Sequence, residues 1–422
     1  MFFDKDYLRN LSWQGFGNVS AQIINVVSLP IITRLFTPGD IGILRVFIEA
    51  LAFTTIIISF RVEQIIMLPK RKNDAVELLL FVFSSGFIST LIISVVVLIL
   101  ILFQLIPSEF FIWAIVLPFT SFLLVFSQAS QQLSQRSGDF KKSGISEIVN
   151  RSTNSSTAII AGIFNSTGIA LGLAVAVGFF FKALIFIKNL KYLSLNLLQN
   201  FYKGLDRIKK GGYSKLLGSI IFSNLLLSVT TISPLWYISY KWGNEYLGYF
   251  SLVLVTLVLP ITLIGKAVGQ VYYQKASSLM SSGVSFNAPF MSNLKFLVTL
   301  SLPIFSFVFF LAPVIYPIFF GDQWLIAGYI AQYYVFAAGI SFISIPLERS
   351  ALVSNAWWYS PIWYIFRASS TLIVIYCVDF FESSFYEFIF WLTIQVASMH
   401  LIDVFASYKF SLRNKPYQSN LF

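Results

Sequence analysis

Apolar runs of about 20 residues recur along the whole chain, and they restrict its fold more than any other feature. A helix of about 20 residues crosses the roughly 30 Å hydrocarbon core of a bilayer. Only 11% of the 422 residues are charged, whereas a soluble domain carries about 25%. A helix also satisfies its backbone hydrogen bonds within one segment, as lipid requires. The sequence therefore predicts an all-α integral membrane protein.

Charged and Gly- or Pro-rich breaks divide the apolar material into twelve expected spans, six on each side of a polar middle segment. The spans lie near residues 10–33, 41–65, 76–104, 110–134, 144–164, 167–187, 214–239, 246–273, 293–319, 324–346, 355–378 and 384–408. The middle segment mixes apolar residues with lysines, a pattern typical of a helix lying on a membrane surface. The expected parts are an N-lobe (1–187), a cytoplasmic amphipathic linker (188–213), a C-lobe (214–408) and a cytoplasmic tail (409–422).

The two halves of the chain are similar at matched positions. Pro30 and Gly42 near the first break correspond to Pro234 and Gly248 near the seventh span. Further on, the sequence SFRVEQ of the first half matches GKAVGQ of the second. Because each half holds an even number of spans, we expect a parallel repeat with a pseudo-two-fold axis along the membrane normal. The binding site should then lie between the lobes.

The lysine and arginine residues of the expected loops lie almost entirely on one side of the membrane. With a cytoplasmic N-terminus, the opposite loops keep only Arg34 and Lys241. Short cytoplasmic loops carry an excess of basic residues, so we expect both termini inside. The formal net charge of +11 then follows from topology, with some attraction to anionic lipid, and requires no nucleic acid as partner. The polar start of the chain, MFFDKDYLRN, predicts no removable signal peptide.

Four charged residues lie on the second expected span, namely Arg45, Glu49, Arg61 and Glu63. A charge near the bilayer centre costs at least about 2.5–3.5 kcal/mol, so it usually faces the bundle interior or a wet cavity. Arg45 and Glu49 are four residues apart and share one helical face, and Glu63 lies on the same stripe, since eighteen residues from Arg45 is five full turns. Arg45 is a candidate ligand for an anion, and the two glutamates are candidates for charge balance. A structural clamp is the alternative for Arg45 and Glu49.

The fifth and eleventh spans carry the other deep charges. Glu147, Asn150, Arg151 and Asn154 recur at helical spacing and form a polar stripe, which should line a cavity or a partner helix. We favour the cavity. Arg367 lies near the middle of the eleventh span and has no acidic residue nearby in sequence. It requires a carboxylate from another span or an anionic ligand, and we favour the ligand.

Other polar residues within the spans admit simpler interpretations. Arg61 and Lys266 lie at matched positions near the cytoplasmic ends of their spans, where snorkelling explains them, as it does Lys182. His400 and Asp403 are three residues apart on the last span, with the spacing of a proton relay. A lone histidine on a packed helix is more often simply hydrogen-bonded in place.

An aromatic cluster begins the eleventh span. Its members are Trp357, Trp358, Tyr359, Trp363 and Tyr364. Such clusters typically form a belt at the membrane interface. Stacking on sugar rings is the alternative.

Few residues suit metal binding, nucleotide binding or covalent catalysis. Cys377 and His400 are the only cysteine and histidine, which excludes an internal disulfide and argues against a zinc or haem centre. No G-x-x-x-x-G-K-[ST] loop for ATP occurs. We therefore expect no enzyme activity and no cofactor. Glu49, Glu63 and Glu147 are the candidates if transport is coupled to H⁺ or Na⁺.

Arginine binds phosphate through a bidentate fork, and such contacts strengthen in a dehydrated cavity. A basic twelve-span bundle with deep arginines therefore suggests an anionic, phosphorylated cargo. Three blocks of sequence carry a resemblance that agrees with this cargo. They read LPIITRLFTPGDIGIL, LPITLIGKAVGQVYYQKAS and PIFFGDQWLIAGYIAQYYVFAAGISFISIPL. In this order they resemble the polysaccharide flippases of the O-antigen (Wzx) type, within the multidrug/oligosaccharidyl-lipid/polysaccharide (MOP) exporter superfamily.

The resemblance implies a twelve-helix, two-lobed, MATE-like fold in the bacterial inner membrane. It implies the transfer of undecaprenyl-diphosphate-linked oligosaccharide repeat units from the cytoplasmic to the periplasmic leaflet by alternating access. Polymerase and chain-length proteins of the same pathway would be partners, together with the lipid bilayer. The diphosphate would be held by cationic residues of a central cavity.

The residues at the matching positions of this chain are Arg45, Arg151 and Arg367, with Arg61 and Lys266 nearer the cytoplasmic mouth and Asn154 on the polar stripe. The chain departs from the family in one place. A basic residue often found just before the proline of the eighth span is missing, because LVTLVLP is uncharged.

Three rival functions follow from the same residues. A MATE-like drug/cation antiporter needs acidic or aromatic cavities, and the deep arginines argue against it. A membrane-bound glycan polymerase or transferase should show a large extramembrane domain or a long periplasmic loop, whereas the expected outer loops are short. A purely structural membrane subunit is disfavoured by the repeat and by the buried charges.

Overall fold

The computed structural model describes residues 5–106, 110–164, 167–192, 196–356 and 358–414. All regular structure in these ranges is helical. The chain forms two compact units, unit 1 (Met1–Ser228) and unit 2 (Val229–Phe422). Each unit is described by itself below.

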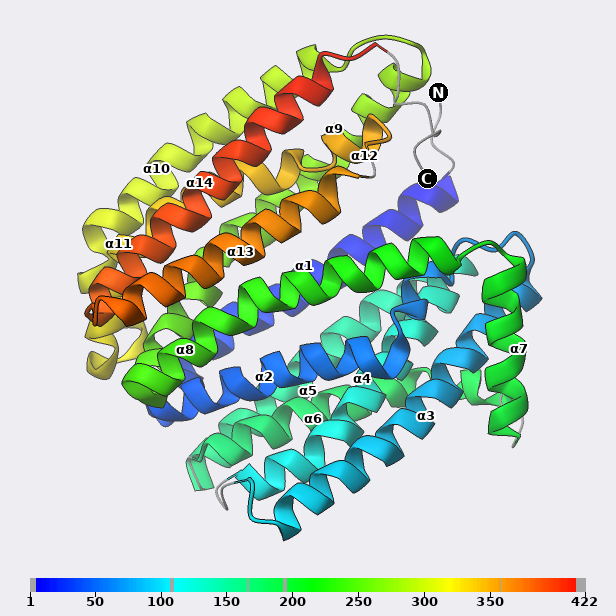
Figure 1. The fold of residues 1–422 in the computed structure, drawn as a ribbon, viewed down its shortest axis with the longest axis horizontal. Helices are drawn as coiled ribbons and strands as arrows, with labels where there is room; N and C mark the ends of the chain where they lie inside the picture. Colours follow the sequence, from blue (N-terminus) through cyan, green and yellow to red (C-terminus); the bar gives the residue numbers. More distant parts are fainter. Residues whose placement is uncertain (1–4, 107–109, 165–166, 193–195, 357, 415–422) are drawn as a thin grey trace. The chain divides into compact units, whose positions relative to one another are not determined.

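Unit 1 holds six long helices followed by a shorter one (Figure 1). Its elements are α1 (Lys5–Leu35), α2 (Pro38–Ser59), the 3₁₀ helix η1 (Val62–Ile65), α3 (Lys72–Leu102), α4 (Phe111–Arg136), α5 (Phe140–Phe164), α6 (Gly168–Ile185), η3 (Ile187–Tyr192) and α7 (Leu197–Lys210). Within it, α1 packs on α5, α5 on α6, and α4 lies against α2, α3 and α6.

Unit 2 begins within α8 (Ser214–Pro260). Gly243 has a φ of 87° and divides α8 into two helical parts. The following elements are the π-helix η4 (Ile261–Gly265), α9 (Lys266–Ser281), α10 (Asn287–Phe320), η5 (Asp322–Trp324), α11 (Leu325–Ser344), η6 (Ile345–Leu347), α12 (Ser350–Val353), α13 (Tyr359–Phe380) and α14 (Phe385–Ser411). Among these, α11 packs against both α10 and α14, and α14 also packs against α13.

Ten segments of the described residues are long and apolar enough to cross a membrane. One of them, Ser214–Ser281, holds two helices because it contains the break at Gly243. The 25-residue helix α5 is not among the ten, since its polar stripe lowers its mean hydropathy. With these two additions the helices match the twelve expected spans, and the predicted all-α membrane fold is confirmed.

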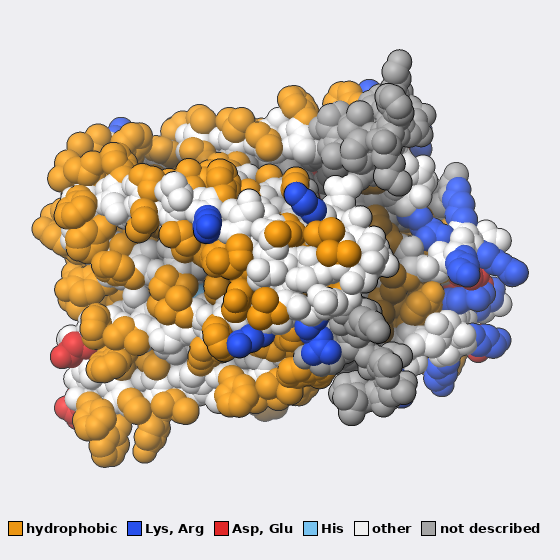
Figure 2. Space-filling model, turned by 90° about the horizontal axis from the view of Figure 1, so that it is seen from above, with side chains coloured by type: hydrophobic (Ala, Val, Ile, Leu, Met, Phe, Trp, Pro, Cys, Tyr) orange, Lys and Arg blue, Asp and Glu red, His pale blue; other side chains and the backbone are white. Residues whose placement is uncertain are grey.

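The surface agrees with a lipid environment. Figure 2 shows hydrophobic side chains over most of the viewed face, and Lys and Arg side chains gathered at the end where Figure 1 places α7. Large apolar side chains such as Phe164 and Phe310 are exposed on the spans. Exposure of this much apolar surface is unfavourable in water and is expected in a bilayer.

The second expected span ends earlier than predicted. Helix α2 stops at Ser59, and Phe60 and Arg61 both have left-handed φ values, 48° and 55°. The Phe60 N–H donates to the Ile56 carbonyl oxygen, and the hydroxyl of Ser59 accepts from the Arg61 N–H at 3.1 Å. The chain therefore leaves the helix axis before Glu63, which lies on η1. The prediction that Glu63 shares a stripe with Arg45 is wrong.

Helix α7 occupies part of the expected linker and packs against α3. The rings of Phe201 and Phe81 stack at 5.0 Å between centroids. Arg207 pairs with Glu77 at 2.7 Å and with Asp74 at 3.0 Å, and the hydrogen bond to Glu77 raises the pKa of Arg207. The expected linker at residues 188–213 stays a prediction, and the division into compact units falls within α8.

Two glycines set the crossing of α1 and α5. A Cβ on Gly17 would lie 2.3 Å from the Cα of Gly144, and a Cβ on Gly144 would lie 2.5 Å from the carbonyl oxygen of Trp13. Small residues allow membrane helices to approach this closely. Farther along the same interface, the hydroxyls of Ser28 and Ser155 are 2.9 Å apart. The packing of α1 on α5 therefore depends on the absence of a side chain at Gly17.

We expect Gly17→Ala to destabilise the folded protein by about 1–3 kcal/mol, because the added methyl group overlaps backbone atoms. Gly15→Ala is the matched control on the same helix, since a Cβ on Gly15 meets nothing within 4 Å. Thermal unfolding of both purified variants in detergent measures the difference. Equal stabilities for Gly17→Ala and Gly15→Ala would contradict the close crossing.

Candidate functional site

Glu147 is the centre of a polar cluster in unit 1. Lys182 of α6 donates to its Oε1 at 2.7 Å, and the amide of Gln131 on α4 donates to the same oxygen at 3.0 Å. The Gln131 amide also reaches the hydroxyl of Ser143 at 2.8 Å. The Lys182 side chain is 6% exposed, so the prediction that it snorkels is wrong. An acidic residue on a neighbouring helix neutralises it instead.

Arg151 lies one turn beyond Glu147 on α5 and is partly buried. Across the part of the chain that the structure describes, no carboxylate lies within ion-pair distance of Arg151. The Oε1 atom of Glu147, on the preceding turn, already accepts a hydrogen bond from Lys182. Arg151 is thus a cation in a membrane span without a direct acidic partner.

The asparagines of the same stripe face α6. A Cβ on Gly178 would lie 2.9 Å from the Asn150 carbonyl oxygen and 3.0 Å from the Cβ of Asn154. The side-chain amide nitrogen of Asn150 is buried and has no hydrogen-bond partner among the described residues. At Asn150 and Asn154 the polar stripe therefore packs against a partner helix, α6. This packing is the alternative to the cavity that we favour from the sequence. The role of Asn154 in binding stays a prediction.

Arg45 and Glu49 form an ion pair on α2. Their side chains are 2.6 Å apart and 22% and 9% exposed. This geometry is that of the structural clamp, although the Nε of Arg45 is buried and has no partner among the described residues. Arg61 and Glu63 pair more loosely, at 3.5 Å. Both of these arginines therefore have a carboxylate at ion-pair distance, whereas Glu147 acts on Arg151 only from farther away.

Arg367 is the corresponding cation of unit 2. Its guanidinium lies 5.1 Å from the ring centre of Trp363, one turn earlier on α13. No described carboxylate lies within ion-pair distance, although Glu348 and Asp403 act on it electrostatically from farther away. A cation–π contact compensates a desolvated guanidinium by about 1–2 kcal/mol. Arg367 is therefore only partly compensated.

Asp403 is held by hydroxyl groups from two other helices. Ser344 of α11 donates to one carboxylate oxygen at 2.7 Å, and Tyr359 of α13 donates to the other at 2.9 Å. The Nδ1 of His400 is 3.2 Å from the Ser344 hydroxyl. His400 is thus hydrogen-bonded in place, and the same serine links it to Asp403. The sequence indicated only the pair of His400 and Asp403, because Ser344 and Tyr359 come from distant segments.

The remaining predicted residues are accounted for briefly. Lys266 is exposed at the start of α9, directly after η4. In the aromatic cluster, the hydroxyl of Tyr359 donates to Asp403, so this residue does more than belong to an interfacial belt. Trp357 lies outside the described residues. Sequence reasoning missed Gln131, although Gln131 and Gln135 are four residues apart on α4 and indicate one polar face.

Comparison with known proteins gives one family and one fold. A family model described as "Polysaccharide biosynthesis protein" matches residues 31–328. A comparison with curated proteins finds no match.

Several solved structures are similar over nearly the whole chain. One is an inward-facing multidrug resistance MATE family transporter of the MOP superfamily, with 14% identity and a TM-score of 0.61, covering 97% of this chain and 94% of that one. A MATE transporter in complex with MaL6 has the same identity and TM-score, covering 95% and 94%. A variant of the Vibrio cholerae MATE transporter VcmN has 12% identity and a TM-score of 0.57, covering 96% and 95%. At these identities the likeness shows the two-lobed MATE fold.

Proposed function

The chain belongs to the polysaccharide biosynthesis protein family, and from this premise we propose that it is a flippase for lipid-linked oligosaccharides. Its cargo is an undecaprenyl-diphosphate-linked repeat unit of O-antigen or a similar surface polysaccharide. It moves this cargo from the cytoplasmic to the periplasmic leaflet of the bacterial inner membrane, with both termini in the cytoplasm. The MATE fold of a membrane transporter supports this proposal. Two deep arginines that have no carboxylate at ion-pair distance among the described residues also support it.

The observation that carries the proposal is the state of Arg151 and Arg367. Each lies within a membrane span of a different unit and has no described carboxylate at ion-pair distance. A buried cation without a partner is costly. A diphosphate offers several oxygens to a guanidinium fork, and charge-assisted pairs of this kind are among the strong hydrogen bonds of proteins. Cargo binding would remove the electrostatic cost that the two arginines impose on the empty protein.

The transport step that we propose is alternating access. The arginines bind the diphosphate, the glycan occupies hydrated space, and the polyprenyl chain stays in lipid. Binding drives the conformational change only if the inward and outward states hold the cargo with different affinity. Arg45, Arg61 and Lys266 would take part as secondary cations, since Glu49 and Glu63 already neutralise the first two in part.

The energy source that we propose is a gradient rather than ATP. Glu49 and Glu147 each hold a cation, Arg45 and Lys182 respectively. A carboxylate in such a pair changes the charge of its cluster when it binds H⁺ or Na⁺. Glu63 is a third candidate for coupling. Transport assays with imposed H⁺ or Na⁺ gradients would show whether transport is coupled to either ion or to neither.

Multidrug transport is the rival function, because the similar structures are MATE transporters. Fold alone does not decide between the two cargoes. An organic cation would meet Arg151 and Arg367 as like charges, which disfavours it. The family model favours a role in polysaccharide biosynthesis. We propose that the protein is not itself a glycan polymerase or transferase, and that such enzymes and chain-length proteins are its partners.

Deletion of the gene in its native bacterium tests the proposal. We expect loss of the surface polysaccharide and accumulation of a diphosphate-linked oligosaccharide lipid at the cytoplasmic leaflet, because the cargo is made but not moved. A deletion strain complemented with the wild-type gene is the control. Normal surface polysaccharide without an accumulated intermediate would contradict the proposal.

A further inference from the structure

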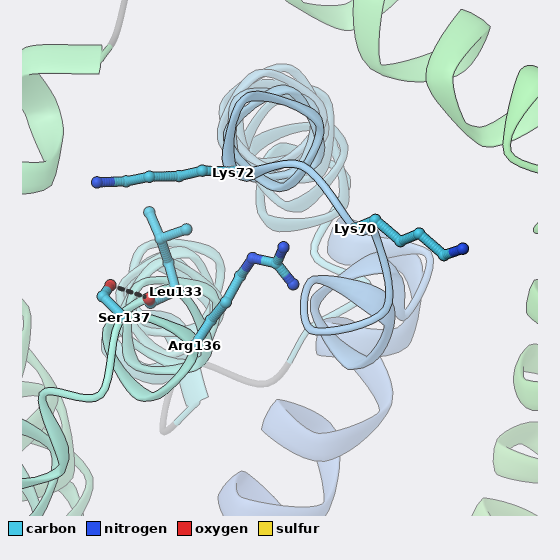
Figure 3. Close-up of a pocket in the computed structure, with 5 residues that line it drawn as sticks. All are labelled: Lys70, Lys72, Leu133, Arg136 and Ser137. Atoms are coloured by element: carbon cyan, nitrogen blue, oxygen red, sulfur yellow. Dashed lines mark hydrogen bonds between the residues drawn. The ribbon is translucent and has the colours of Figure 1, made fainter.

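A cationic pocket lies in unit 1, away from Arg151. It has a volume of about 330 Å³ and is lined by Lys70, Lys72, Leu133, Arg136 and Ser137. These residues come from the loop before α3, the start of α3 and the end of α4 (Figure 3). The positive-inside rule assigns this end of unit 1 to the cytoplasm.

The polar groups of the pocket are arranged around Arg136. Figure 3 shows its guanidinium between Lys70 and Lys72, whose side chains extend to either side. Arg136 uses Nη1 to donate to the carbonyl oxygen of Met67 at 2.8 Å, which fixes the side chain and leaves its Nη2 group for a ligand. The Ser137 hydroxyl donates to the Leu133 carbonyl oxygen at 2.7 Å, and it can still accept a hydrogen bond.

The acidic residues of the adjoining segments are engaged elsewhere. Asp74 and Glu77 of α3 pair with Arg207 of α7, at 3.0 and 2.7 Å. Asp139 accepts a hydrogen bond from the backbone N–H of Lys142 at 3.1 Å. None of the residues that line the pocket is acidic. Helix α7 thus engages Asp74 and Glu77, and among the described residues no ion pair involves Lys70, Lys72 or Arg136.

The first turn of α3 carries Asp74, which is paired with Arg207, and its backbone N–H groups point toward the helix N-terminus. Arg71 precedes the helix and makes no side-chain hydrogen bond that caps it. Uncapped N–H groups and the helix dipole both favour an anion at a helix N-terminus.

We propose that this pocket binds a phosphate group. Its volume is at the low end of ligand pockets, which are typically about 300–1,000 Å³, so it suits a phosphate or diphosphate with little else. A phosphate oxygen would accept from the Nη2 group of Arg136. The two lysines are long and exposed and extend away from the guanidinium in Figure 3, and they would turn toward the bound phosphate as point charges. The group comes from an anionic lipid headgroup or from free phosphate in the cytoplasm. This site is separate from Arg151 and Arg367 and does not depend on their cargo.

Binding to the purified full-length protein tests this site. The probes are inorganic pyrophosphate added to detergent-solubilised protein, and nanodiscs that contain phosphatidylglycerol compared with nanodiscs of phosphatidylcholine alone. The variant is Lys72→Gln/Arg136→Gln, and the control is Lys209→Gln, an exposed lysine of α7 that does not line the pocket. Each probe is read as the shift in the thermal unfolding midpoint on binding.

We expect pyrophosphate, phosphatidylglycerol or both to stabilise the wild-type protein and the Lys209→Gln control. The double variant should bind the effective probe about tenfold more weakly, because it loses charge-assisted contacts. Stabilisation by pyrophosphate alone assigns the site to a free phosphate, and stabilisation by phosphatidylglycerol alone assigns it to a lipid headgroup. Failure of both probes, or equal binding by Lys209→Gln and the double variant, overturns the proposal. The single variant Lys72→Gln leaves the Arg136 contact to Met67 intact. We expect it also to bind the effective probe more weakly than the wild-type protein, and loss of that contact would not be the reason.

Discussion

Replacing Arg367 by alanine should abolish surface glycan export while the protein still accumulates in the membrane. The guanidinium lies in a membrane span, contacts the ring of Trp363 at 5.1 Å, and has no described carboxylate at ion-pair distance, although Glu348 and Asp403 act on it from farther away. Two charge-assisted hydrogen bonds to a diphosphate, at about 1.5–3 kcal/mol each, correspond to a loss on the order of a hundredfold or more in cargo affinity. Removal of the cation–π contact costs only about 1 kcal/mol of stability. Transport should therefore fail long before folding does.

Matched variants separate charge from geometry at this position. Arg367→Lys keeps the charge but loses the fork, so we expect partial export. Arg151→Ala should fail as Arg367→Ala does, whereas Lys209→Ala, an exposed cation on α7, should export normally. Surface glycan is measured by antibody labelling of intact cells, with protein level checked by immunoblot. Wild-type glycan in both Arg151→Ala and Arg367→Ala would remove the proposed anion site.

Replacing Lys182 by methionine should destabilise the protein by about 1–3 kcal/mol, because the Glu147 carboxylate, which is 29% exposed, keeps part of its hydration when its cation is lost. Lys182 is almost fully buried and pairs with Glu147 at 2.7 Å. Methionine fills much the same space, so the loss comes from the carboxylate that remains in the membrane without its cation. The hydrogen bond from Gln131 at 3.0 Å would compensate only part of this cost. Chemical unfolding in detergent measures the effect.

The double variant Glu147→Gln/Lys182→Met is the decisive comparison. Because it removes both charges, we expect it to recover most of the lost stability, as a double-mutant cycle would reveal. Glutamine can still accept the hydrogen bond from Gln131. If the double variant is as unstable as the sum of the two single variants, the two residues do not act as a buried ion pair.

The spans could be predicted from sequence because their length and apolar character follow directly from bilayer thickness. Helix α5 shows that the residue pattern predicts a span better than mean hydropathy does. Its polar stripe lowers the mean hydropathy of a 25-residue helix. The end of α2 was not predictable in this way. Phe60 and Arg61 adopt left-handed conformations in an apolar stretch that contains neither glycine nor proline, so nothing in the local sequence indicates the break.

Contacts within one helix were predictable, and contacts between helices were not. The spacing of Arg45 and Glu49 indicates their ion pair directly. Lys182 and Glu147 lie on different helices, and so do Tyr359 and Asp403, so only the packing of the folded chain brings each pair together. This distinction also explains why the deep arginines stood out in sequence. Their need for a partner was visible, but which of them already had one was not.

Reconstitution of the purified protein tests the central claim most directly. Vesicles would hold a labelled undecaprenyl-diphosphate-linked oligosaccharide, and an impermeant glycosidase would report the fraction of cargo that reaches the outer leaflet. We predict rapid transfer with the wild-type protein, and transfer no faster than in protein-free vesicles with the Arg151→Ala/Arg367→Ala variant. Equal transfer by the wild-type protein and this variant would contradict the account, as would wild-type transfer no faster than in protein-free vesicles.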